Sequence, residues 1–171
     1  MTAEQFQQLV LPHKNKLYRF ALAYLDEANA KDIVQEVMLS AWEKIKDPRS
    51  VNNIEAWCMT LTRNKSLNML KKKGRTYLQI SEQYDLSSQE ASPLQKTAGN
   101  EIADTIGQII GQLPEKQRAV ITLRDMEEYS YKEIAEILNL DMNHVKVLLF
   151  RARKQVKETL TRINNYGISH A

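Results

Sequence analysis

The segment from Ser130 to Leu149, SYKEIAEILNLDMNHVKVLL, brings together side chains that suit sequence-specific contact with DNA. Lysine and asparagine can hydrogen-bond to purine edges in a major groove, and apolar side chains can contact thymine methyl groups. Arginine and lysine on the following turns suit phosphates, which position a protein without specifying a sequence. The candidate contacts are Asn143, His144, Lys146, Val147, Phe150, Arg151, Arg153 and Lys154. The alternative is an ordinary helical hairpin with a charged face, in which Val147 and Phe150 belong to the core.

The same segment has the residues that a helix-turn-helix needs. Ser130 and Glu133 have the spacing of a capping box, which predicts a helix start. Ala135 is small where the two helices would touch, Asn139 tolerates the left-handed conformation of the turn, and Asp141 suits the cap of a second helix. Packing onto the rest of the domain is expected from Ile134, Leu138, Leu140, Val145 and Leu148. The second helix would then present its other side to a major groove.

Helical periodicity also dominates the rest of the chain, so the predicted fold class is all-α. One helix is expected from Ala3 to Leu25, a second from about Asn29 until Pro48 stops it, and a third after Asn52, which would cap it. We predict two small helical domains, residues 1–75 and 98–165. Residues 76–97 are polar and rich in Ser and Gln, which indicates a flexible linker, with a long ordered surface loop as the alternative.

The charge distribution supports two cationic surfaces. Residues 63–75 contain six basic residues and no acid, and residues 144–162 contain six Lys or Arg residues against one acid. Clustered positive charge can follow a phosphate backbone, although two solvated helix surfaces would give the same pattern. The net charge of +3 is too small to decide between them.

Several classes of site find no support in the sequence. The three histidines have no companions at metal-ligand spacing, and Cys58, on the apolar side of a helix, is expected to be a packed thiol. The chain has no phosphate-binding glycine loop, nucleophile elbow or paired-carboxylate motif. We therefore expect no catalytic residue, metal, cofactor or small-molecule substrate. The lack of a secretory signal, of a long apolar run and of a cysteine pair fits a cytoplasmic protein.

A family resemblance follows from YSYKEIAEILNLDMNHVKVLLFRARKQVKETL and the preceding LPEKQRAVITLRDMEEYS. These strings resemble the C-terminal domain of bacterial sigma factors, which reads the promoter −35 element. The resemblance implies base and backbone contacts at Lys146, Val147, Phe150 and Arg151. The family often has Ser and Arg after the Lys, where this chain has Val147 and Leu148, so its −35 sequence is expected to differ.

The N-terminal half resembles the same family. Residues 32–45, DIVQEVMLSAWEKI, are similar to a helix that docks on a coiled coil of the largest polymerase subunit, which implies contacts at Asp32, Gln35, Glu36 and Trp42. Without the resemblance, a packed helix with Trp42 in the core would be the simpler interpretation. Residues 57–75 resemble the −10 reader, which implies contacts at Arg63, Asn64, Asn68, Lys71 and Lys72. The family's loop before that helix captures an unpaired base, and residues 47–57 occupy its position here.

Two domains without the additional domains of housekeeping sigma factors indicate the extracytoplasmic-function (ECF) group. The resemblance implies promoter DNA and core RNA polymerase as partners, and an anti-sigma factor, often membrane-anchored, as an inhibitor. The alternative is a stand-alone helix-turn-helix regulator with an N-terminal sensing or partner-binding domain, which would bind paired half-sites without polymerase.

Overall fold

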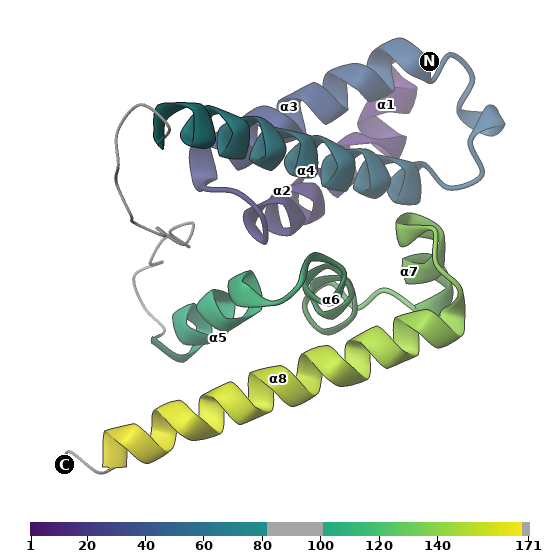
Figure 1. Cartoon of the computed structure of the whole chain (residues 1–171). Coiled ribbons are helices and arrows are strands. Elements are labelled where there is room, and N and C mark those ends of the chain that lie inside the picture. Colours follow the sequence, from purple (N-terminus) through teal and green to yellow (C-terminus); the bar gives the residue numbers. More distant parts are fainter. Residues whose placement is uncertain (82–100, 169–171) are drawn as a thin grey trace. The chain divides into compact units, whose positions relative to one another are not determined.

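The computed structural model describes residues 1–81 and 101–168, and these residues form helices and connecting turns without a strand. The chain divides into two compact units, Met1–Pro93 and Leu94–Ala171 (Figure 1). The predicted all-α fold is confirmed. Most of the predicted linker, residues 82–97, lies outside the described residues, and residues 76–81 are the last turns of a helix.

In the first unit three helices enclose one core. Helices α2 (Lys14–Leu22), α3 (Glu27–Lys44) and α4 (Ile54–Ser81) contact one another pairwise, and Figure 1 shows α3 and α4 running side by side. The apolar side chains on their inward sides are fully or almost fully buried. Burying one large apolar side chain stabilises the folded state by about 1.5–3 kcal/mol. The largest members are Leu17, Phe20, Ile33, Val37 and Met59.

The prediction of one helix from Ala3 to Leu25 was wrong. The chain forms α1 (Ala3–Leu9), a 3-10 turn η1 (Leu11–His13) and then α2. Pro12 lies at the start of the 3-10 turn, where its missing N–H is tolerated, but inside an α-helix it would have removed a hydrogen bond. The second helix agrees more closely with its prediction. Pro48 was expected to stop it, and α3 ends four residues before Pro48.

The cap of α4 is Asn53 instead of the predicted Asn52. The Asn53 side-chain oxygen accepts a hydrogen bond from the N–H of Ala56 at 2.9 Å, while Asn52 is exposed. Glu55, in the first turn of α4, forms an ion pair with Lys16 at 2.9 Å. Because the cap lies one residue later than predicted, the helix also starts one residue later.

The second unit packs shorter helices on one long helix. Helices α5 (Glu101–Gln112) and α6 (Glu115–Ile121) lie against α8 (Met142–Ile168), the yellow helix of Figure 1. A π-helical turn, η3 (Thr122–Met126), follows α6 and leads to α7 (Tyr131–Leu138). Apolar side chains from all four helices meet in the core, among them Ile110, Val120, Leu123, Ile134, Ile137, Val145 and Leu149.

None of the helices in the described residues is both long and apolar enough to cross a membrane.

Candidate nucleic-acid interface

Local hydrogen bonds set the geometry of the helix-turn-helix. The Ser130 hydroxyl oxygen accepts a hydrogen bond from the Glu133 backbone N–H at 3.2 Å. The Glu133 carboxylate accepts one from the Ser130 backbone N–H at 2.8 Å, so the predicted capping box is present. Asn139 ends α7 with φ of 51°, the predicted left-handed residue. The Asp141 carboxylate accepts the N–H of His144 at 2.8 Å and caps α8. The capping box therefore starts α7, Asn139 ends it, and Asp141 starts α8.

Helix α8 has a buried row and an exposed side. Val145, Leu149 and Ala152 are at most 2% exposed and attach the helix to its own unit. Val156, one turn beyond Ala152, is half-buried, and so is Leu140 in the turn. Every predicted DNA-contact residue of this helix is exposed, namely Asn143, His144, Lys146, Val147, Phe150, Arg151, Arg153 and Lys154. The alternative that places Val147 and Phe150 in the core is therefore excluded.

Two apolar side chains stand among these polar ones. Val147 is 44% exposed and Phe150 is 69% exposed, one turn apart on the helix. Leu148, the other departure from the family's Ser and Arg, is only 6% exposed and belongs to the core. The apolar change on the outer side of α8 is therefore confined to position 147.

Arg153 is held by an acid that the sequence analysis did not single out. The Asp125 carboxylate accepts hydrogen bonds from Nε of Arg153 at 2.9 Å and from Nη2 at 2.5 Å. These bonds raise the pKa of the Arg153 guanidinium above its ordinary value. Asp125 lies in η3 and Arg153 in α8, so the pair connects this turn to α8.

Tyr131 gathers two further cations at the start of α7. The Arg124 guanidinium lies 5.0 Å from the Tyr131 ring centroid, and the Lys146 ammonium lies 5.7 Å from it. Arg124 also donates a hydrogen bond to the Tyr129 carbonyl at 2.8 Å. Cation–π contacts at exposed sites are worth about 0.5–1 kcal/mol, enough to favour one orientation of Lys146.

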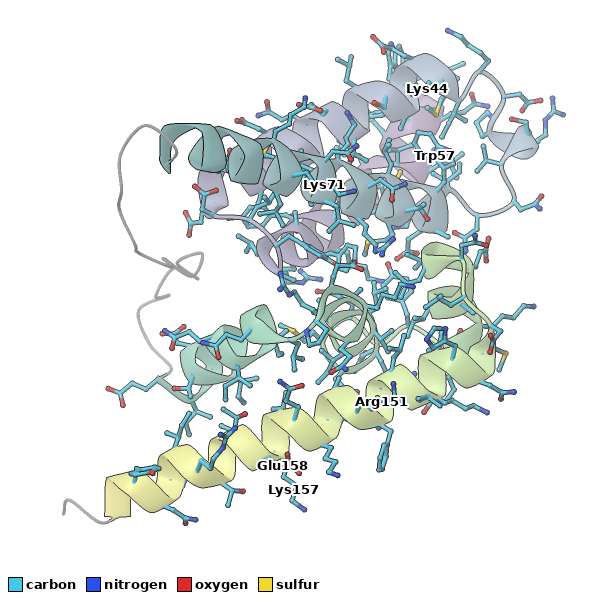
Figure 2. All side chains as sticks on the ribbon, in the orientation of Figure 1. Lys44, Trp57, Lys71, Arg151, Lys157 and Glu158 are labelled. Atoms are coloured by element: carbon cyan, nitrogen blue, oxygen red, sulfur yellow. The ribbon has the colours of Figure 1, made fainter. Side chains whose placement is uncertain are left out.

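The second cationic surface lies on α4. Asn64, Asn68, Lys71 and Lys72 are exposed, and their spacing of three or four residues places them along one side of the helix. Lys71 is labelled on this helix in Figure 2. Arg63 is half-buried at the edge of the same surface. Four of the five residues predicted to contact the −10 element thus share one exposed side of α4, while Arg63 lies about 100° around the helix from Asn64.

The segment before α4 is ordered by local contacts. A 3-10 turn η2 (Pro48–Ser50) follows Asp47, whose carboxylate accepts hydrogen bonds from the Arg49 side chain at 3.1 Å and from its backbone N–H at 3.0 Å. Both bonds lower the pKa of Asp47. Arg49 remains highly exposed, which leaves a cation near the beginning of the segment predicted to receive an unpaired base.

Helix α3 presents a mixed surface opposite its buried row. Asp32, Gln35, Glu36 and Trp42 are all exposed, and Glu36 pairs with Lys65 of α4. Trp42 is 43% exposed and contacts Phe6 edge-on, with ring centroids 5.6 Å apart, so the interpretation as a core residue is wrong. Leu39, which the sequence analysis did not single out, is 56% exposed one turn from both Gln35 and Trp42.

A largely apolar groove of about 510 Å³ adjoins this surface. It is formed where α1, η1 and α2 meet α3. Its lining includes Phe6, Leu11, Tyr18, Val34, Gln35 and Met38. Only Gln35 had been predicted as a contact, because the other residues belong to segments whose packing the sequence pattern does not give.

No cluster of three or more His, Cys, Asp or Glu residues able to hold a metal occurs among residues 1–81 and 101–168. Cys58 is fully buried, and burial, with a smaller effect of the Glu55 charge, raises its thiol pKa to about 12. A buried neutral thiol is a poor nucleophile, as expected for a packing residue.

Comparison with known proteins assigns both units to one family. Residues 9–76 match the family model "Sigma-70 region 2", and residues 103–156 match "Sigma-70, region 4". The ECF RNA polymerase sigma-E factor of Haemophilus influenzae is 27% identical over 164 residues, covering 91% of this chain and 87% of that protein. SigW of Bacillus subtilis, also an ECF sigma factor, is 28% identical and covers 92% of this chain and 89% of that protein. The chain belongs to the sigma-70 family, in its ECF group.

A solved structure agrees with this assignment. The sigma factor RpoE from Bartonella quintana, in complex with the anti-sigma factor NepR, superimposes on this sigma factor with a TM-score of 0.76 at 25% identity. The match covers 93% of this chain and 98% of that one. Members of the family are initiation factors that bind core RNA polymerase and promoter DNA, and this function is assigned to the present sigma factor. Two sigma-70 regions in this order do not favour the alternative of a stand-alone regulator.

Proposed function

We propose that this ECF sigma factor reads the promoter −35 element with the exposed side of α8 and the −10 element with the exposed side of α4. The observation that carries the proposal is that α8 has two different sides. Val145 belongs to its buried row, and Lys146 belongs to its exposed side. The domains assigned to the two tasks are residues 98–165 and residues 1–75. Coupling two weak DNA contacts through one polymerase supplies the avidity that neither contact has alone.

The α8 contacts divide into two groups by chemistry. Asn143, His144 and Lys146, on the first turns of the helix, carry hydrogen-bond donors suited to purine edges, and Val147 and Phe150 suit thymine methyl groups. Arg151, Arg153 and Lys154 suit phosphates, which fix the register of the helix on the duplex. A promoter read in this way should contain thymines at the positions under Val147 and Phe150.

On α4 the exposed amides and lysines match a strand that is being opened. Lys71 and Lys72 carry positive charge for the phosphates, while Asn64, Asn68 and the half-buried Arg63 can hydrogen-bond to base edges. Residues 47–57 are proposed to receive the unpaired base, because they lead into the first turn of α4 and carry the exposed Arg49. Holding a base outside the stack offsets part of the unstacking cost of a few kcal/mol.

Core polymerase is proposed to bind the surface of α3 with the groove beside it. Asp32, Gln35 and Glu36 offer an acidic and amide surface for a basic helical partner. Trp42 and Leu39 add exposed apolar area, and a partner helix could extend into the groove at Met38. A central apolar contact with a polar surround is the usual anatomy of a specific protein interface.

The regulation and location proposed here follow from the family. We propose an anti-sigma factor as the inhibitory partner, supported by the similarity to a sigma factor solved in complex with one. A cytoplasmic location fits a subunit of RNA polymerase, and the chain is proposed to have no catalytic activity of its own.

The proposal is tested by binding measurements on the full chain. The chain should co-elute with core polymerase, and a promoter fragment should be retarded strongly only when polymerase is present. Leu39→Ser should weaken the affinity for core polymerase about tenfold or more, which is the loss expected for an apolar residue central to an interface. Lys44→Ser, at an exposed position on another side of the same helix, is the matched control and should bind like the wild type. Tight binding of the free chain to paired half-sites, unchanged by polymerase, would overturn the proposal.

A further inference from the structure

The side of α8 that carries Arg153 borders a shallow hollow of about 490 Å³ in the second unit. Its lining includes Tyr131 from α7 and five residues of α8, namely Lys146, Phe150, Arg153, Lys154 and Lys157. Four of these are cationic, and no acid occurs among the described residues that line it. Figure 2 shows the Lys157 side chain extending from α8 on the side away from α5 and α6.

A charged residue near this hollow has the wrong sign for DNA. Asp125 is bound to Arg153 through both carboxylate oxygens, so its negative charge lies beside a surface proposed to meet phosphates. By charge alone, Asp125 should weaken DNA binding, and its removal should strengthen it. Its geometry suggests a different role.

The hydrogen bonds leave part of the Arg153 guanidinium available. Asp125 takes the Nε–H and one N–H of Nη2, which leaves both protons of Nη1 and one of Nη2. The Arg153 side chain is 51% exposed, so this remaining edge can reach a ligand. Fixing a long side chain in the free protein removes the entropy cost of ordering that side chain on binding.

We propose that Asp125 is a positioning residue for DNA binding, which presents the free edge of Arg153 to one backbone phosphate of the −35 duplex in the hollow beside Tyr131. This inference rests on the proposed −35 function and specifies how one phosphate is held. Lys154, whose ammonium lies 4.0 Å from the Glu158 carboxylate, and Lys157, one turn further along α8, add positive charge at the hollow. Lys146, oriented by the Tyr131 ring, then approaches the bases from a helix whose register the phosphate has set.

The sign of one substitution tests the proposal. Holoenzyme assembled with full-length Asp125→Asn is titrated with a promoter fragment over a range of salt concentrations and compared with the wild-type holoenzyme. Binding should weaken about three- to tenfold even though a negative charge has been removed. Without Asp125 to position it, Arg153 should lose its charge-assisted hydrogen bond to the DNA phosphate. The slope of log affinity against log salt should also fall by about 0.9, the value of one phosphate contact.

Three comparisons separate positioning from general effects. Glu136→Gln removes an exposed acid from α7 and should leave affinity unchanged or slightly higher. Arg153→Gln should reproduce the loss, and Asp125→Asn should then cause no further loss in that background. Melting temperatures of the variants show whether the second unit is still folded. If Asp125→Asn does not fold, Arg153→Lys serves instead. The lysine ammonium keeps the positive charge but lacks the planar fork of the guanidinium, so the same loss of promoter affinity is expected.

Tighter or unchanged binding by folded Asp125→Asn would overturn the proposal, as would wild-type affinity in Arg153→Lys. These results would leave the −35 function intact, provided that the wild-type holoenzyme binds the promoter. A wild-type holoenzyme without salt-dependent promoter binding would instead refute the proposed function, and this inference with it.

Discussion

At the scale of single residues, exposure and packing separate functional side chains from structural ones. Phe150 is 69% exposed on α8, and Ile102 is 70% exposed on α5, so neither contributes much to its core. Phe150→Ala and Ile102→Ala should therefore both leave the melting temperature almost unchanged. Only Phe150→Ala should weaken promoter binding by the holoenzyme, by about tenfold, since the contact with base methyl groups is lost. Equal effects of the two substitutions on binding would contradict a base-reading role for Phe150.

Cys58 allows a residue-scale prediction about pH. Burial raises its thiol pKa to about 12 from an ordinary value of 9.0, so the folded state holds the proton more tightly than the unfolded chain. This contribution to stability is present below pH about 9 and is lost as the pH rises from there toward 12. Thiol labelling at pH 8 should be slow in buffer and fast in denaturing urea, and Cys58→Ala should be less sensitive to alkaline unfolding. Fast labelling of the native chain would show that the thiol is accessible.

At the scale of the elements, the turn between α7 and α8 depends on the backbone of Asn139. Its φ of 51° costs most residues about 1–2 kcal/mol. Asn139→Ala should lower the free energy of unfolding by about 1 kcal/mol, whereas Asn139→Gly should keep or raise it. Chemical unfolding followed by circular dichroism measures both. Asn143→Ala, in the right-handed helix that follows, is the control and should be neutral. An alanine variant at position 139 as stable as the glycine variant would contradict the role of this turn.

The elements also show which features the sequence could predict. The capping box at Ser130, the left-handed Asn139 and the cap at Asp141 are each decided within a few residues, and all three are confirmed. The break at Pro12 was missed because helical periodicity continues on both sides of it. The Asp125–Arg153 pair joins residues 28 positions apart, and it requires the π-helical turn that local patterns do not reveal.

At the scale of the whole molecule, the two units are expected to divide the work of initiation. The surface proposed to read the −10 element lies on α4 in the first unit, and the surface proposed to read the −35 element lies on α8 in the second. Lys71→Glu with Lys72→Glu should reduce strand opening by the holoenzyme about tenfold or more, because phosphate contacts become repulsive. Permanganate reactivity of unpaired thymines measures opening. Affinity for a duplex that carries only the −35 element should stay unchanged, and a parallel loss there would contradict the division.

The groove beside α3 marks the limit of prediction at this scale. Asp32, Gln35, Glu36 and Trp42 could be proposed from one helix and its resemblance to the family. Phe6, Leu11 and Tyr18 join them only through the packing of α1, η1 and α2 against α3, which depends on contacts distant in sequence. The same packing places Phe6 against Trp42, with ring centroids 5.6 Å apart, while Trp42 stays 43% exposed.

The central claim is that the exposed side of α8 selects promoters for RNA polymerase. The most direct test is to transcribe genomic DNA with core polymerase loaded with this chain and to map the 5′ ends of the transcripts. We predict initiation at a limited set of sites that share one upstream element, and loss of these sites when Lys146→Glu and Arg151→Glu are combined in a chain that still binds polymerase. Starts without a shared upstream element, or the same starts from the double variant, would contradict the claim.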